Sequence, residues 1–144
     1  MRVEKIYRYP VKGLTAEALE EVALTEGAML PEDRRFALAQ GDSPFDPANP
    51  AWLQKRHFGC LMANARLALV HSAFDPHSGV LTLTIPGQPP MAEDTRTEAG
   101  RLAIAAALSA YLGEEARGTP RFLEAPGHAF SDVAAKVVSI IGLG

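Results

Sequence analysis

Hydrophobic and polar residues alternate along the first stretch of the chain. From Arg2 to Tyr9 the pattern follows an imperfect period of two, and Pro10 then lacks the N–H that would extend a ladder. Such alternation predicts a strand with one buried face. The stretch YRYPVKG ends this strand on a bend that places a cation, Lys12, directly before Gly13.

Further short stretches have the composition of strands and are bounded by Gly, Pro, Asp or Asn, which favour turns. The predicted strands span residues 19–24, 35–40, 66–73, 80–85 and 121–124, with a nearly continuous apolar run at 136–143. The stretch FDPHSG between the third and fourth of these carries Asp, Pro and Gly, so it predicts a hairpin.

The pattern predicts one main helix, at residues 98–112. Thr95 and Glu98 have the spacing of a capping box at its start, and Gly113 supplies the stop. Apolar residues recur at helical spacing and form one stripe, made of Ile104, Leu108, Tyr111 and Leu112. This stripe is expected to face a core.

A proline-rich loop at residues 41–50 leads into a second, shorter predicted helix at residues 51–58. Asn49 suits its cap, and Pro50 suits its first turn because the missing N–H is not needed there. Together the elements predict an α+β fold, a small and mostly antiparallel β-barrel with one main packed helix. A chain of 144 residues is long enough for one such domain.

Composition narrows the classes of function. Hydrophobic residues make up 47% and charged residues 22%, as in ordinary globular proteins, and the net charge of −3 argues against a nucleic-acid binder. No apolar run approaches the roughly 18 residues of a membrane span. The single cysteine, Cys60, suits a reducing compartment, so the expected location is cytoplasmic.

The common catalytic and metal motifs are missing. His57 and Cys60 stand three residues apart, but a zinc site needs three or four ligands and the other histidines are scattered. Cys60 has apolar neighbours, which favours a structural thiol over a reactive one. The sequence therefore predicts no metal site and no catalytic residue.

The basic residues near the bend leave two interpretations open. Lys12 can meet an anion as a point charge, with the Gly13 amide approaching closely, and Arg34 with Arg35 can add a bidentate clamp. In the alternative, the arginines are solvated positions beside Glu32 and Asp33. The spacing of these residues does not decide between the two.

The stretches YPVKG, LEEVALTEGAMLPEDRRFAL and WLQKRHF, in this order, resemble the N-terminal β-barrel domain of MOSC proteins. MOSC is the module shared with the C-terminus of molybdenum cofactor sulfurase, and a similar pattern occurs in the mitochondrial amidoxime-reducing component. The stretch AFSDVAAKVVSIIGL is similar to the start of the MOSC core. The resemblance thus implies a barrel domain at residues 1–128 and the beginning of the core at residues 129–144.

The resemblance implies a role for the basic residues. In family members with bound molybdopterin, the lysine of the bend and an arginine of the D-R strand reach the phosphate, which points to Lys12 and Arg34, with Gly13 and Arg35 adjacent. It implies that intact members handle molybdenum cofactor, sulfur transfer or reduction of N-hydroxylated compounds, and it associates the family with molybdenum ion and pyridoxal phosphate binding. Relatives often have serine where this chain has Gly13, and Cys60 does not match the metal-binding cysteine of the core.

The chain alone is therefore expected not to be catalytic. Its expected partner is the missing MOSC core, or a second copy that associates through the C-terminal strand, because an apolar strand at residues 136–143 needs cover on both faces. A stand-alone small binding or interaction module without catalytic activity is the alternative.

Overall fold

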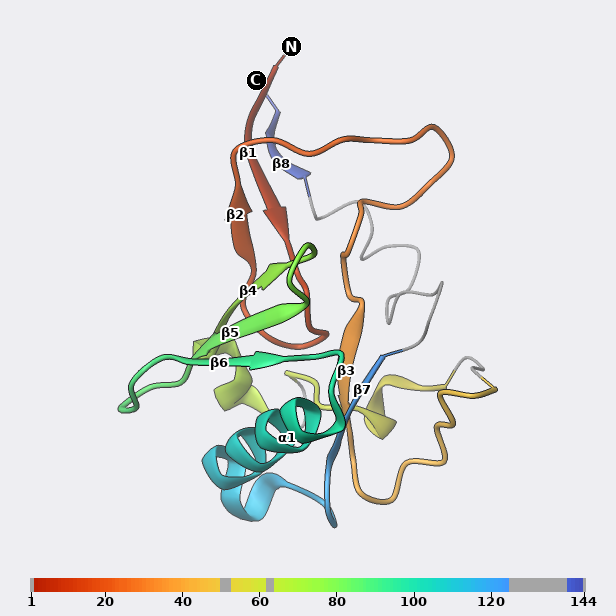
Figure 1. Ribbon diagram of the computed structural model, residues 1–144, viewed down its shortest axis with the longest axis vertical. Coiled ribbons are helices and arrows are strands. Elements are labelled where there is room, and N and C mark those ends of the chain that lie inside the picture. Colours follow the sequence, from red (N-terminus) through yellow and green to blue (C-terminus); the bar gives the residue numbers. More distant parts are fainter. Residues whose placement is uncertain (1, 50–52, 62–63, 125–139, 144) are drawn as a thin grey trace.

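A computed structural model describes residues 2–49, 53–61, 64–124 and 140–143 (Figure 1). These residues form eight strands, one α-helix and three short 3-10 helices. The strands are β1 (Val3–Arg8), β2 (Glu17–Leu19), β3 (Phe36–Ala39), β4 (His71–Asp75), β5 (Val80–Thr84), β6 (Met91–Asp94), β7 (Arg121–Glu124) and β8 (Ile140–Leu143). The helices are η1 (Lys55–His57), η2 (Ala65–Leu69), α1 (Glu98–Leu112) and η3 (Gly113–Glu115).

The pairings of these strands divide them into three sheets, with the orders β2-β1-β8, β3-β7 and β4-β5-β6. Every pair of neighbouring strands is antiparallel. With one α-helix beside them, the sheets confirm the predicted α+β class with mostly antiparallel strands. The predicted hairpin is also present, since β4 and β5 pair in register from His71 opposite Thr84 to Asp75 opposite Val80.

The segment Tyr9–Ala16 joins the three sheets. On one side it runs parallel to the start of β3, where the Lys12 N–H donates to the Phe36 carbonyl at 2.9 Å and the Phe36 N–H donates to the Pro10 carbonyl at 3.0 Å. On the other side it reaches the start of β4, where the Thr15 N–H donates to the Val70 carbonyl at 2.9 Å. We call residues 9–16 the junction segment.

The main core lies between α1 and the sheets (Figure 1). The predicted stripe of α1 is buried as expected, with Ile104 and Leu108 fully inaccessible to solvent. Three aromatic rings from β3, β4 and β7 form its centre, since the ring of Phe36 lies 5.1 Å from Phe74 and 5.3 Å from Phe122. Burial of each of these side chains contributes about 1.5–3 kcal/mol to folding. These contacts therefore stabilise the packing of β3, β4 and β7.

Two predicted strands were wrong in their bounds. The strand expected at residues 19–24 is β2, at Glu17–Leu19, and Leu24 is 62% exposed. The strand expected at residues 66–73 begins only at His71, because residues 65–69 form η2. The strand β6 was not predicted at all. In contrast, β7 was predicted with its observed bounds, and β3 differs by one residue at each end.

The predicted bounds of α1 are confirmed, but its predicted cap was wrong. The side chain of Thr97, not Thr95, accepts a hydrogen bond from the Gly100 N–H at 2.9 Å. Thr95 is buried, and its hydroxyl donates instead to the Gly79 carbonyl at 2.6 Å. Gly113 ends the helix at a positive φ of 58°, as the sequence indicated.

Of the shorter predicted helix at residues 51–58, the described part contains the 3-10 turn η1 rather than an α-helix. Its predicted first turn lies outside the described residues, as do the boundary at residues 128–129 and positions 136–139 of the predicted last strand. The rest of that strand is β8, which pairs antiparallel with β1, Val3 opposite Leu143. Among the described helices, none has the length and apolar character needed to cross a bilayer.

Candidate functional site

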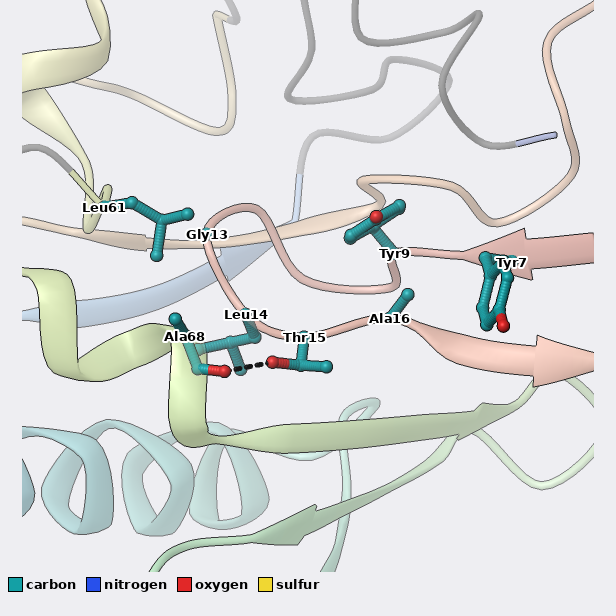
Figure 2. A pocket seen from close by; sticks show the side chains of 8 residues that line it. All are labelled: Tyr7, Tyr9, Gly13, Leu14, Thr15, Ala16, Leu61 and Ala68. Atoms are coloured by element: carbon teal, nitrogen blue, oxygen red, sulfur yellow. Dashed lines mark hydrogen bonds between the residues drawn. The ribbon is translucent and has the colours of Figure 1, made fainter. Parts of the chain in front are cut away.

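An open hollow of about 360 Å³ lies against the junction segment (Figure 2). Its lining is mostly apolar and comes from β1, the junction segment, Leu61 and η2. The lining residues are Tyr7, Tyr9, Gly13, Leu14, Thr15, Ala16, Leu61 and Ala68. Of the four residues that the sequence nominated, only Gly13 lines this hollow.

The bend at Gly13 is a tightly packed turn. Gly13 has a φ of +88°, and a Cβ atom added to it would lie 2.8 Å from the carbonyl oxygen of Gly59. A residue with a side chain is therefore excluded twice, by the backbone conformation and by the contact. The hydroxyl of Thr15 donates to the Ala68 carbonyl, which fixes the bend to η2 (Figure 2). Glycine at position 13 thus fits the local geometry.

Arg34 is buried and holds Tyr9 in place. Its guanidinium lies 2.5 Å from the carboxylate of Asp33 and 4.2 Å from the centroid of the Tyr9 ring. The other carboxylate oxygen of Asp33 accepts the Tyr9 N–H at 2.8 Å, and the Arg34 N–H donates to the Tyr9 carbonyl. Both the backbone and the ring of Tyr9 are therefore fixed by Asp33 and Arg34.

Arg35 takes part in a separate cluster of charges. It donates to Glu32 at 2.6 Å and to Glu124, at the end of β7, at 2.8 Å. Burial lowers the pKa of the guanidinium, but its hydrogen bonds to the carboxylates of Glu32 and Glu124 outweigh this effect, so the pKa of Arg35 is raised above its ordinary value. Arg35 thus remains cationic while it links the turn before β3 to β7.

The structure brings the two basic stretches together through the backbone. Val11 pairs with Phe36 in the parallel contact described above, and Lys12 is the next residue, so the bend and the Arg34–Arg35 pair lie on neighbouring segments. Three carboxylates accompany them, however, those of Glu32, Asp33 and Glu124. The formal charges of the three cations and the three carboxylates cancel. Arg34 is thus buried rather than solvated, Arg35 is partly buried, and both have carboxylate partners.

Sequence reasoning missed the two tyrosines of the hollow. Tyr7 and Tyr9 are two residues apart at the end of the predicted strand, so they lie on one face of it. That alternation, directly before the glycine bend, was the available signal. It also missed Arg8, which is buried and donates to Glu17 at 2.6 Å and to the Phe74 carbonyl at 2.9 Å.

The thiol of Cys60 is buried beside the bend, as the sequence indicated for a structural cysteine. It belongs to a segment held by Asn64, whose side-chain oxygen accepts the Cys60 N–H at 3.4 Å and the Gln40 amide at 3.1 Å. Within the described residues, no group of three or more His, Cys, Asp or Glu side chains is placed to hold a metal ion.

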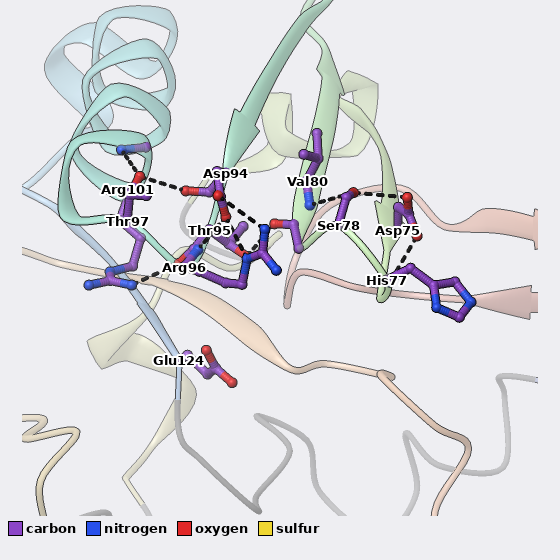
Figure 3. Close-up of polar contacts among 12 residues, drawn as sticks. Asp75, His77, Ser78, Val80, Asp94, Thr95, Arg96, Thr97, Arg101 and Glu124 are labelled. Carbon is purple, nitrogen blue, oxygen red and sulfur yellow. Dashed lines mark hydrogen bonds and ion pairs between the residues drawn. The ribbon is translucent and has the colours of Figure 1, made fainter.

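A second concentration of polar side chains lies where the β4–β5 turn meets the start of α1 (Figure 3). Asp75 accepts from the Ser78 hydroxyl at 2.8 Å, and Asp94 accepts from Arg96 at 3.1 Å. Hydrogen bonds from Ser78 lower the pKa of Asp75, and those from Arg96 lower the pKa of Asp94. Because these bonds close turns within the chain, this cluster is structural.

Comparison with known proteins identifies the family. No curated protein and no solved structure matches the chain. The family model described as the MOSC N-terminal beta barrel domain matches residues 1–119, which includes the junction segment, both basic stretches and α1. This confirms the resemblance drawn from the YPVKG and DRRF stretches. The chain belongs to the MOSC N-terminal beta barrel domain family.

Proposed function

We propose that this domain flanks a molybdenum cofactor or substrate site in the intact protein, and that its junction segment contacts an anionic group there. The proposal rests on family membership and on one observation, the parallel contact that brings the Lys12 bend against the start of β3. The intact protein would carry out sulfur transfer or reduction of N-hydroxylated compounds, with molybdenum held by a core domain.

Within this proposal Lys12 is the principal cation. It lies in the turn, directly before Gly13, and is partly exposed, so a phosphate can approach it without breaking the core. The Gly13 amide lies next to it. Lysine carries a point charge, and glycine has no side chain that would keep a phosphate group away from the backbone N–H. Lys12 and Gly13 together therefore suit contact with a phosphate group.

The two arginines contribute differently. Arg34 is 8% exposed and carries Asp33 as its partner, and Arg35 is shared between two glutamates. An anion that reaches either guanidinium must share it with a carboxylate. We therefore assign Arg34 and Arg35 the role of holding the segment that faces the anion. Either guanidinium contacts the anion directly only when a carboxylate moves away from it.

A cytoplasmic location stays a prediction.

The test uses the intact natural protein. Purified protein is analysed for bound molybdenum and pterin phosphate, and the Lys12→Gln variant is compared with Lys5→Gln, a matched change on an exposed lysine of β1. Loss of one charge-assisted contact, about 1.5–3 kcal/mol, should reduce cofactor retention at least tenfold in Lys12→Gln alone. Equal retention in both variants would refute the anion contact, and absence of molybdenum from the wild type would favour the stand-alone binding module.

A further inference from the structure

We infer that the hollow beside the junction segment is a binding site for an uncharged aromatic ring system, with Tyr9 as its fixed wall. The hollow shares Gly13 with the proposed anion contact, but the inference does not depend on that contact. The volume of about 360 Å³ is at the small end of the roughly 300–1,000 Å³ of small-molecule sites.

The lining selects against charge. Tyr7 and Tyr9 supply aromatic surface, and Leu14, Leu61 and Ala68 supply aliphatic surface. The lining residues include no Asp, Glu, Lys, Arg or His. An ionised ligand would lose hydration there, and the lining offers it no charged side chain, so an uncharged ligand is favoured.

The polar groups of the bend are already used inside the protein. The Leu14 N–H donates to the Val11 carbonyl at 3.3 Å and the Thr15 N–H to the Val70 carbonyl at 2.9 Å. The Thr15 hydroxyl donates to the Ala68 carbonyl (Figure 2). A ligand therefore gains little from hydrogen bonds to this bend, and its affinity comes from apolar contact and ring packing.

The walls are fixed before a ligand arrives. Tyr9 is held through its N–H by Asp33, and the Arg34 guanidinium lies over its ring. Gly13 packs against the backbone of Gly59, and the Thr15 hydroxyl donates to η2. A site with immobile walls loses little side-chain entropy on binding, which favours a flat and rigid ligand such as a single or fused ring. Arg34 is thus a positioning residue for Tyr9.

The experiment is an NMR titration with indole, a neutral fused ring, on the chain with labelled tyrosine rings and backbone amides. Saturable shifts are expected at Tyr7, Tyr9 and Thr15. Ala68→Phe should abolish them by filling the hollow, whereas Ala65→Phe, a matched change at an exposed position of η2 outside the lining, should leave them unchanged. Tyr9→Leu should raise the Kd by about three- to tenfold through loss of ring packing.

Three results would overturn the inference. These are shifts that map elsewhere, equal binding by Ala68→Phe and wild type, or equal affinity for indole and cyclohexanol. Inorganic phosphate titrated in parallel distinguishes this site from the anion contact, because it should leave the ring signals of Tyr7 and Tyr9 unshifted. In each variant, the dispersion of the amide spectrum verifies folding, and Tyr9→Phe keeps the ring and should retain wild-type affinity.

Discussion

The guanidinium carbon of Arg34 lies 4.2 Å from the centroid of the Tyr9 ring, while the Arg34 N–H donates to the Tyr9 carbonyl. The two residues are 25 positions apart, yet they are bound through both backbone and side chain. Arg34 adopts a positive φ of 48°, which is unfavourable for a residue with a side chain. The contacts to Tyr9 and Asp33 offset this cost and fix the turn that precedes β3.

Removal of the Asp33 carboxylate should strongly destabilise the domain. Asp33→Ala leaves Arg34 buried without its carboxylate, and breaking a buried pair in this way costs about 3–5 kcal/mol. Asp33→Asn keeps an acceptor for the Tyr9 N–H and should cost less. Denaturant unfolding followed by circular dichroism measures both, with Glu4→Ala, at an exposed pair, as the control. Equal stability of Asp33→Ala and Glu4→Ala would contradict the role of the pair.

Gly13→Ala should destabilise the domain more than Gly27→Ala. Both glycines have positive φ, +88° and +75°, so both substitutions incur the conformational cost of about 1–2 kcal/mol. Only at Gly13 would the added Cβ also meet a backbone atom, the Gly59 oxygen at 2.8 Å. The difference between the two free energies of unfolding isolates the contact. A difference of zero would show that the bend can move away from Gly59.

Gly100→Ala should lower stability, although alanine ordinarily stabilises a helix by up to about 1 kcal/mol relative to glycine. An added Cβ would lie 2.0 Å from the Asp94 carbonyl oxygen and 2.9 Å from the Thr97 hydroxyl oxygen that caps α1. Accommodating it must displace the cap or β6. Thermal unfolding of Gly100→Ala is compared with Ser109→Ala in the same helix. A higher midpoint for Gly100→Ala would contradict the observed packing.

Ser78→Ala should raise the pKa of Asp75. The Ser78 hydroxyl is the largest cause of the lowered pKa, followed by the His77 N–H. Since the folded-state pKa lies below the ordinary value of 3.8, these bonds stabilise the turn above that pH, and their contribution is lost as the pH falls through the folded-state pKa. The carboxyl carbon signal of Asp75, titrated by NMR, gives the value. An unchanged titration curve in Ser78→Ala would assign the shift to the backbone alone.

The sequence predicted those elements whose position depends on nearby residues alone. The apolar stripe of α1 and the turn residues between β4 and β5 act locally, so their positions follow from the chain itself. Where contacts between distant residues determine the position of a strand, the hydrophobic pattern gave a wrong prediction. β2 lies at Glu17–Leu19 because the Glu17 carboxylate meets the buried Arg8 and the Phe74 N–H, which the apolar alternation of residues 19–24 does not reveal.

The candidate site was predictable in its backbone and less so in its side chains. The resemblance implies that Lys12 and Arg34 reach one phosphate, which stays a prediction, and the parallel contact at Phe36 brings their backbone segments side by side. The resemblance did not show that Arg34 pairs with Asp33 and stacks on Tyr9. The stacking depends on a positive φ at Arg34, which a residue with a side chain disfavours. The β6 strand was missed because Met91–Asp94 has few β-forming residues, and its pairing to β5 decides its conformation.

The junction segment also has a consequence for synthesis of the protein. Tyr9 and Pro10 can pair once residue 36 has been made, but Thr15 needs Val70, and Arg8 needs the Phe74 carbonyl. On the ribosome, β1 therefore stays incompletely paired even then, because its second edge pairs with β8, which spans Ile140–Leu143. During that interval its backbone groups are open to pairing with another nascent chain. The short β2 and the charged residues Glu4 and Lys5 along β1 limit this hazard.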